Sequence, residues 1–435
     1  MARTQSIQIR EVLNTLVPPS RLGRLARQTG AVVRLRRIGA VPFFWTLVLG
    51  FGADRTRTLA GLRRAFESAT GRTVVPSAFY DRFNAGLVRL LRAVLAEVIT
   101  KVGRQEKTLD GALAGFKDVL VSDSTVIRLH DMLKKAFPAC RTNHTLAALK
   151  AHVILSVRGA GAKSVKITSE RVHDGPVLRA GRWVKDTLLL FDLGYHRFQL
   201  FACIDREGGY FVTRLKKSDN PLVTGLNLNP RGRKVPLLGQ RLKPLLKKLK
   251  RRVIDVEVEL SYRKRKYGGS RSGAKYRCRL VGIFNEETKC HHTYLTNVPA
   301  SRLDARQIAE TYKARWLVEL LFRELKTRYR LDQMPSANPH VVEALILAAF
   351  ITILVAQRML QHVERRLRTL RHRLRTERWA AVFATYAGEI LRLLLAPDDN
   401  PHPTRLGAVM LRESVDPNAR RQLLLQRVSG APHAA

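Results

Sequence analysis

Cysteine is scarce in this sequence, and the few residues present are far apart. The 435 residues include four cysteines, with no Cys-x-x-Cys pair: Cys140, Cys203, Cys278 and Cys290. This spacing argues against a disulfide framework and a zinc ribbon. His291 and His292 follow the last cysteine and could hold a metal, but no second ligand pair stands at finger-like spacing. We therefore interpret residues 290–292 as the edge of a strand.

Acidic residues are few relative to basic ones. The chain has 78 Lys and Arg against 35 Asp and Glu, which gives a formal net charge of +43. Such an excess is typical of a protein whose partner is a polyanion, and nucleic acid is the leading candidate. A membrane surface is the competing partner.

Long apolar runs are also missing. The longest, residues 344–356, has 13 residues with one interruption at Thr352, and it is too short to span a bilayer. The sequence begins MARTQSIQIR without a continuous apolar segment, so no secretory signal is predicted. We expect a cytoplasmic protein in which residues 344–356 lie in a buried helix.

One run without Pro or Gly, residues 312–326, carries a distinctive spacing. It places Tyr312, Arg315, Glu319 and Lys326 in the order Tyr-x2-Arg-x3-Glu-x6-Lys. At about 100° per residue, one continuous helix would hold the four side chains within a sector of roughly 60°. A carboxylate between cations suits a metal site that meets phosphates, because Glu offers hard oxygens to Mg²⁺ or Mn²⁺. A solvated helix face with ordinary ion pairs is the alternative.

Short runs of aliphatic and β-branched residues begin near residue 116 and predict an α/β sheet. We expect strands at residues 119–121, 149–157, 164–169 and 187–191. Asp123 should fall just past the first of these strands. Asp192 should end the fourth, where Gly194 permits a sharp turn into a helix that begins near Tyr195.

Asp123 and Asp192 are candidate metal ligands, because carboxylates at strand ends of an open α/β sheet face the ligand crevice. With Glu319 as the third carboxylate, they could clamp two divalent ions about 4 Å apart for in-line phosphoryl transfer. Each aspartate also has a structural alternative, Asp123 as a turn residue and Asp192 as a helix cap. Four nearby acids compete for the same role: Asp118, Asp186, Asp205 and Glu324.

Helical patterns flank the predicted sheet on both sides. Residues 1–105 predict a small helical domain, in which residues 58–68 and a second helix from Pro76 surround a turn at Gly71. This arrangement is compatible with a DNA-reading helix-turn-helix and equally with a bundle that supports the next domain. Residues 361–435 predict a basic helical region and a tail, whose charge either binds DNA or faces solvent.

The segment between Asp192 and Glu319 contains strands of its own. Alternating patterns at residues 252–260, 276–284 and 293–298 predict three strands there. Residues 262–269 would form a basic hairpin tip with two tyrosines, suited to DNA contact but also compatible with a solvated turn.

Together these motifs resemble the DDE transposases of bacterial insertion sequences. The resemblance is carried by Asp123 in Asp-Ser-Thr, by Asp192 in Asp-x-Gly-Tyr, and by the Tyr-Arg-Glu-Lys signature with Trp316 beside its Arg. This signature gives its name to one subgroup, YREK. The similarity covers about residues 116–360 well and the ends of the chain loosely.

The resemblance implies an RNase H-like catalytic domain, in two parts at residues 116–215 and 301–360, interrupted by the inserted β domain at 216–300. Asp123, Asp192 and Glu319 would be the catalytic carboxylates and would hold two Mg²⁺ ions, with Mn²⁺ able to substitute. Tyr312, Arg315 and Lys326 would contact DNA at the element's terminus.

The activity that this resemblance implies is cleavage at terminal inverted repeats followed by strand transfer into target DNA. The protein would act as a homodimer in a paired-end complex associated with the nucleoid. A transposase-derived DNA-binding regulator that no longer cleaves is the alternative.

Overall fold

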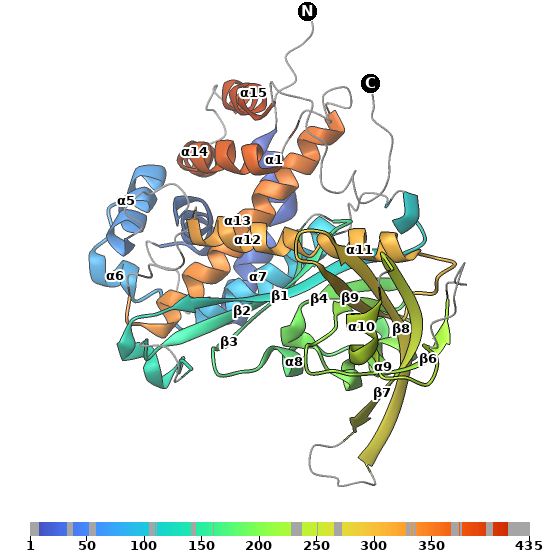
Figure 1. Ribbon diagram of the computed structural model, residues 1–435. Helices are drawn as coiled ribbons and strands as arrows, with labels where there is room; N and C mark the ends of the chain where they lie inside the picture. The colour runs from blue at the N-terminus through green and yellow to red at the C-terminus, as the bar shows by residue number, and fades with distance from the viewer. Residues whose placement is uncertain are drawn as a thin grey trace, which may run out of the picture.

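The computed structural model describes most of the chain. The described residues are 8–32, 38–51, 58–103, 109, 111–140, 145–159, 161–227, 237–249, 251–264, 272–327, 331, 334, 336–366, 374, 376–396 and 403–415. Within them the protein is a mixed α/β structure, in agreement with the predicted class. A group of helices stands on one side of a large sheet, and further helices lie on the other side (Figure 1).

The described strands form one mixed sheet in the order β3-β2-β1-β4-β5-β9-β8-β7-β6. Their bounds are β1 Asp118–Arg128, β2 Ala148–Ser156, β3 Gly161–Ser169, β4 Thr187–Phe191, β5 Tyr210–Arg214, β6 Leu222–Leu226, β7 Val253–Arg263, β8 Gly273–Asn285 and β9 Cys290–Thr296. The parallel pairs are β1 with β4 and β4 with β5, and the other neighbours are antiparallel. The four predicted strands before Asp192 are all present, and β1 is longer than expected.

The N-terminal segment is helical, as predicted. Its elements are α1 Ile9–Leu16, α2 Pro19–Gln28, α3 Ala40–Trp45, the π-helical turn η1 Thr46–Gly50, α5 Leu59–Thr70, α6 Pro76–Tyr80 and α7 Ala85–Gly103. The Thr58 hydroxyl caps α5 by accepting from the Gly61 backbone N–H at 3.0 Å. Gly71 ends the helix with a φ of 66°, a left-handed conformation that glycine adopts at little cost. The predicted helix, turn and second helix are therefore present.

The remaining helices follow the sheet strands along the chain. They are α8 Asp174–Val177, α9 Phe198–Arg206, α10 Leu242–Lys248, α11 Ala305–Lys313, α12 Trp316–Thr327, α13 Pro339–Arg366, α14 Thr376–Leu395 and α15 Pro403–Ser414, with short 3₁₀ turns at η2 Gly111–Leu113, η3 Asp131–Lys135, η4 Arg182–Val184 and η5 Leu193–Tyr195. In α13, residues 339–365 are long and apolar enough to cross a membrane, but 78% of the apolar window is buried inside the protein. The prediction of a buried core helix is confirmed.

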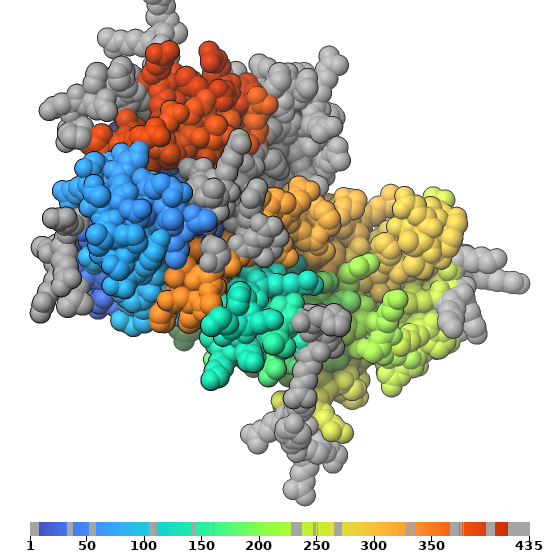
Figure 2. Space-filling view, turned by 90° about the vertical axis from the view of Figure 1, so that its left-hand side faces the viewer, coloured from blue at the N-terminus to red at the C-terminus, as the bar shows by residue number. Residues whose placement is uncertain are grey.

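Strand alternation divides the core into two clusters, one on each face of the sheet. Val119, Val121 and Val153 point to the face that packs on α7, α12 and α13, which we call face A. Leu189 and Phe191 point to the other face, face B, and pack with residues of α9. In the space-filling view the helical part of the molecule and the sheet lie as adjoining masses, with α13 between them (Figure 2).

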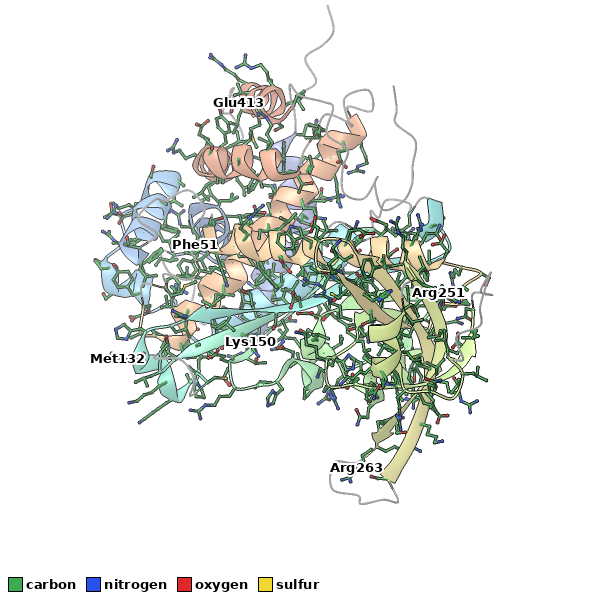
Figure 3. All side chains as sticks on the ribbon, in the orientation of Figure 1. Phe51, Met132, Lys150, Arg251, Arg263 and Glu413 are labelled. Atoms are coloured by element: carbon green, nitrogen blue, oxygen red, sulfur yellow. The ribbon has the colours of Figure 1, made fainter. Side chains whose placement is uncertain are left out.

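The strands predicted as an insertion belong to the same sheet in this structure. Strand β9 pairs with β5, with Val212 opposite Thr296, so β6 to β9 extend the sheet beyond β5. Strand β6 and helix α10 were not predicted. The β7–β8 ribbon projects past its neighbours, and Arg263, labelled in Figure 3, lies near its end. Most of the hairpin tip predicted at residues 262–269, its residues 265–269, lies outside the described residues.

The prediction of one continuous helix over residues 312–326 is wrong. Tyr312 lies in the last turn of α11, Ala314 and Arg315 form a turn, and α12 begins at Trp316. Backbone N–H groups of Ala314 and Arg315 donate to carbonyls three residues back, those of Thr311 and Tyr312, both at 3.0 Å. Such bonds tighten the chain and change the helix direction without Pro or Gly, so the sequence carries no signal for the break.

Candidate active site

Asp123 and Asp192 come from neighbouring parallel strands. The register of β1 and β4 ends with Ser122 opposite Phe191, so the two aspartates are the next residues on their strands. Strand β1 continues beyond this point, where Asp123 pairs with Val153 of β2, whereas β4 stops. The prediction that Asp123 falls past the end of its strand is therefore wrong, because its pairing with β2 carries β1 onward. The prediction that Asp192 ends its strand is confirmed.

Glu319 reaches this position from the helix above. Helix α12 packs on β1 and β2 at face A, the face to which Asp123 points by alternation from Val121. The Arg315 guanidinium joins the two acids, with Nη1 at 3.2 Å from Asp123 Oδ2 and Nη2 at 2.5 Å from Glu319 Oε1. The Arg315 and Asp123 side chains are each only 19% exposed, so this ion pair is largely shielded from water.

The electrostatics of Asp123 reflect its burial first and the charges around it second. Burial raises the pKa of the Asp123 carboxyl to about 6. A bond from the Ser124 N–H at 2.7 Å and the charge of Arg315 lower this pKa, while the charges of Asp192 and Glu319 raise it. The three carboxylates are therefore close enough to repel one another. Such mutual repulsion is the condition that a bound cation relieves.

Asp192 is available to a ligand. It occupies the position before η5, but its side chain does not cap that turn, so the cap alternative is wrong for the carboxylate. Among the described residues no hydrogen bond or ion pair engages this carboxylate, although its charge acts on Asp123, Tyr312 and Arg315. The expected helix after Asp192 begins at Phe198 rather than near Tyr195.

Tyr312 lies beneath the site. Its ring is 7% exposed and stacks at a tilt against Tyr294, with 5.2 Å between ring centroids. The hydroxyl donates to the Phe191 carbonyl at 3.4 Å, and burial raises the pKa of the phenol well above its usual range. Tyr312 thus holds the end of β4 directly before Asp192.

Lys326 stands at the open end of the same helix. It is exposed in the last turn of α12, seven residues and about 10 Å along the axis from Glu319. The break at residues 314–315 separates Tyr312 from this helix, and three of the four signature residues remain close together. Arg315 and Glu319 meet directly, and Tyr312 lies beside them, with Arg315 Cζ 5.9 Å from its ring centre.

The donor set fits hard divalent cations. Three carboxylates from two strands and a helix supply the oxygen ligands that Mg²⁺ and Mn²⁺ prefer. In the described part of the chain no three acid, His or Cys side chains stand at ligand distance from one point. The Arg315 guanidinium lies between two of the carboxylates, in contact with Asp123 and Glu319.

Two competing acids lie elsewhere. Asp118 is buried at the far end of β1, where it accepts from Ser156 Oγ at 2.8 Å and pairs with Lys163 Nζ at 3.2 Å. Asp205 on α9 accepts from Asn297 Nδ2 at 2.8 Å. Both have structural partners away from Glu319.

Asp174 was not among the residues predicted from the sequence, and it lies behind the site. It begins α8 on face B, where its Oδ1 accepts from Ser124 Oγ at 2.9 Å and lies 3.1 Å from Nζ of Lys150, labelled in Figure 3. His152 joins the group, with Nδ1 3.5 Å from Asp174 Oδ1 and 3.4 Å from Tyr195 Oη. These contacts hold Ser124, the residue after Asp123, and Tyr195, which lies three residues after Asp192.

The chain is similar to proteins of known class. Residues 114–355 match the family model of the transposase DDE domain. The chain is 20% identical over 347 residues to the transposase for insertion sequence element IS1151 of Clostridium perfringens, an alignment that covers 73% of each chain. It is 22% identical over 383 residues to the transposase for IS231F of Bacillus thuringiensis subsp. israelensis, which covers 79% of this chain and 78% of the relative.

Among solved structures, the piggyBac transposase in a synaptic complex with hairpin DNA aligns over 93% of this chain and 85% of its own. The TM-score is 0.44 at 8% identity, a similarity too low to establish a shared fold.

Proposed function

Because the chain belongs to the transposase DDE-domain family and is a DNA-cleaving, strand-transferring enzyme of the insertion-sequence type, we propose that Asp123, Asp192 and Glu319 are its catalytic carboxylates. The observation that carries this assignment is their convergence. Two aspartates leave adjacent parallel strands at one level, and Arg315 ties the first of them to a glutamate on the covering helix.

The same three side chains would hold the metal. Transposases of this family generally depend on divalent cations, and we propose Mg²⁺ here, with Mn²⁺ able to substitute. Bound ions would activate the attacking water or 3′-hydroxyl and stabilise the leaving oxygen. Asp123 and Glu319 would become ligands once Arg315 releases them.

A released Arg315 would face the DNA. Its planar guanidinium pairs with phosphate as readily as with carboxylate, and we propose that it exchanges one for the other. Lys326, exposed at the end of α12, would hold a phosphate farther along the strand. Tyr312 completes the predicted DNA-binding set; its burial favours a contribution through Arg315 and the end of β4 over a broad contact of its own.

The finer family assignment is also a proposal. Tyr312, Arg315, Glu319 and Lys326 support the YREK subgroup, and the order β3-β2-β1-β4-β5 supports an RNase H-like catalytic domain. We propose domains at residues 1–105, 116–215, 216–300, 301–360 and 361–435. The third would be the inserted β domain, and the first and last would assist DNA binding.

The biological setting follows from this activity. We propose cleavage at the terminal inverted repeats and strand transfer into target DNA by a homodimer in a paired-end complex. The work would be done in the cytoplasm, at the nucleoid. The net charge of +43 supports close association with DNA.

A DNA-binding regulator without cleavage is the second candidate. A regulator would also need the positive charge and the flanking helices, but it would not need three carboxylates that repel one another around Arg315. Burial is the main cause of the raised pKa of Asp123, and the charges of Asp192 and Glu319 add to it; a carboxylate kept in so unfavourable a place favours the enzyme.

The deciding experiment is cleavage of a labelled fragment that carries the terminal sequences flanking the gene, with Mg²⁺ or Mn²⁺. We expect metal-dependent cutting at the repeat boundary. Asp123→Ala, Asp192→Ala or Glu319→Ala should each abolish it while DNA affinity stays within roughly a few-fold. Glu310→Ala is the matched control, because Glu310 is an exposed acid on α11 that pairs with Lys313. Tight binding without cutting by the unaltered protein would establish the regulator instead.

A further inference from the structure

A cavity of about 280 Å³ lies on the side of the sheet opposite the carboxylates. Ser122, His152 and Ser164 line it from β1, β2 and β3, and the segment leading to β4 closes it with Val177, Leu178 and Trp183. By strand alternation Ser122 points to face B, away from Asp123. The cavity is thus separate from the proposed active site, although both include residues of the same strand.

The lining combines an apolar slot with positive charge. Three cations border it, Lys163, Lys166 and Arg179, and none of its described lining residues is acidic. Lys166 Nζ donates to the Val177 carbonyl at 3.3 Å, which holds the ammonium at the cavity wall. Arg179 is exposed. An anion would therefore be attracted to the rim, while an apolar, flat group would be accepted within.

Trp183 presents a fixed aromatic surface to this cavity. Its Nε1 donates to the Arg179 carbonyl at 3.1 Å, and the residue remains 40% exposed although the next residue, Val184, is fully buried. The other described tryptophans differ: Trp45 and Trp379 are buried, and Trp316 stands on α12 away from the cavity. An indole held at its edge and open on a face is a stacking platform for a base.

We propose that this cavity binds one nucleotide of single-stranded DNA, with the base stacked on Trp183 and the phosphate held by Lys166 and Arg179. The assignment rests on the proposed function, since cutting and joining of DNA ends exposes unpaired strands. A duplex does not fit, because its bases are stacked on one another and a cavity of this size accepts a single unit. Strand β3 is the edge of the sheet, so a DNA strand can pass the opening.

The test measures binding of a labelled short oligothymidylate to the full-length protein in EDTA, by fluorescence anisotropy. Trp183→Ala should weaken binding about fivefold or more, and Trp183→Phe should retain most of the affinity because it keeps an aromatic face. Affinity for a duplex of equal length should change by less than about twofold in both variants. Lys166→Ala should weaken single-strand binding more than Lys185→Ala, a matched control that removes an exposed lysine outside the lining.

Equal single-strand affinity in the unaltered protein, Trp183→Ala and Trp183→Phe would overturn the proposal. Thymidine monophosphate that displaces the oligonucleotide with equal affinity would overturn the DNA assignment and make the site one for free nucleotides. A thermal unfolding curve of each variant would reveal a folding defect. Trp183→Phe shows whether loss of the aromatic ring is what weakens binding. Because EDTA prevents cleavage, a failure of the proposed enzymatic function would leave this binding result unaffected.

Discussion

The positive charge of Arg315 offsets the negative charges of the Asp123 and Glu319 carboxylates when no metal is bound. Its guanidinium contacts Asp123 and Glu319 through two different nitrogens, and the residue lies in the turn at 314–315 between α11 and α12. A lysine offers one compact charge and cannot span both acids in this way. Under the proposed function, Arg would be needed at this position for two reasons: charge balance before metal binding and phosphate contact after it.

Asp123 should destabilise the folded protein at neutral pH, because its pKa in the fold is about 6 and an unfolded Asp has a pKa of about 3.9. The folded state binds the proton more tightly, so stability from this group is highest below pH 4 and is lost as pH rises through 6. Asp123→Asn should raise the free energy of unfolding at pH 7.5 by about 1–3 kcal/mol and have little effect at pH 4. Denaturant unfolding in EDTA at both pH values measures this. A destabilised variant at pH 7.5 would show that the bond to Arg315 outweighs the repulsion.

The connection between the outer strands and α11 depends on a buried ion pair. Arg279 on β8 and Asp255 on β7 are both about 3% exposed, and their side chains form two bonds of 2.8 and 2.6 Å. Arg279 also donates to the carbonyls of Val298 and Leu303, which precede α11. The extended part of the sheet is thereby fastened to the helix that carries Tyr312.

Arg279→Leu should cost about 3–5 kcal/mol of unfolding free energy, because it leaves the Asp255 carboxylate buried without its partner. Asp255→Asn combined with Arg279→Leu should recover part of this loss, since the unpaired charge is removed. Urea unfolding of the single and double variants gives the values. A double variant no more stable than Arg279→Leu would place the cost in the lost bonds to Val298 and Leu303.

Sequence periodicity predicted most of the strands, because their side chains alternate between the two faces or are apolar throughout. It also placed Asp192 at the end of its strand, before Leu-Gly-Tyr. Asp123 and Glu319 were chosen as candidates because they are acids in a suitable place along the sequence. It failed at the turn between α11 and α12 and at the length of β1. Both are set by tertiary packing: α12 must reach β1, and β2 continues to pair with β1 beyond Asp123. Trp183 and Asp174 were missed because their meaning depends on neighbours distant in sequence.

Two helical glycines provide a paired test of close packing. A Cβ at Gly86 in α7 would lie 2.4 Å from the Gly30 carbonyl oxygen, a backbone atom, whereas one at Gly23 in α2 would meet nothing within 4 Å. Gly86→Ala should therefore destabilise the protein by about 1–3 kcal/mol. Gly23→Ala should stabilise it by roughly 0.5–1 kcal/mol through helix propensity and lower unfolded-state entropy. Thermal unfolding compares them, and a stable Gly86→Ala would mean that α7 can shift away from Gly30.

Across the whole molecule, the sheet separates two chemistries. The carboxylates lie on face A, which is covered by helices that include α12 and α13. The Trp183 cavity lies on face B. The net charge of +43 gives every DNA sequence a sizeable, salt-sensitive affinity. We propose that a few cations placed near the carboxylates position the DNA end by contacting its phosphates, on top of this general attraction.

Lys326 is an exposed cation on α12, the helix that carries Glu319, and its contribution to DNA binding can be measured separately. Lys326→Ala should weaken binding to a terminal-repeat duplex and lower the slope of log K against log salt by about one, because one phosphate contact is lost. Lys117→Ala removes the same charge at the opposite end of the sheet, where the Lys117 N–H donates to the Asp186 carbonyl before β4 begins. It should leave the slope nearly unchanged. Anisotropy titrations over a range of salt concentrations decide between them. Equal slopes for both variants would mean that Lys326 acts only through the general field of the protein and makes no phosphate contact at the element's end.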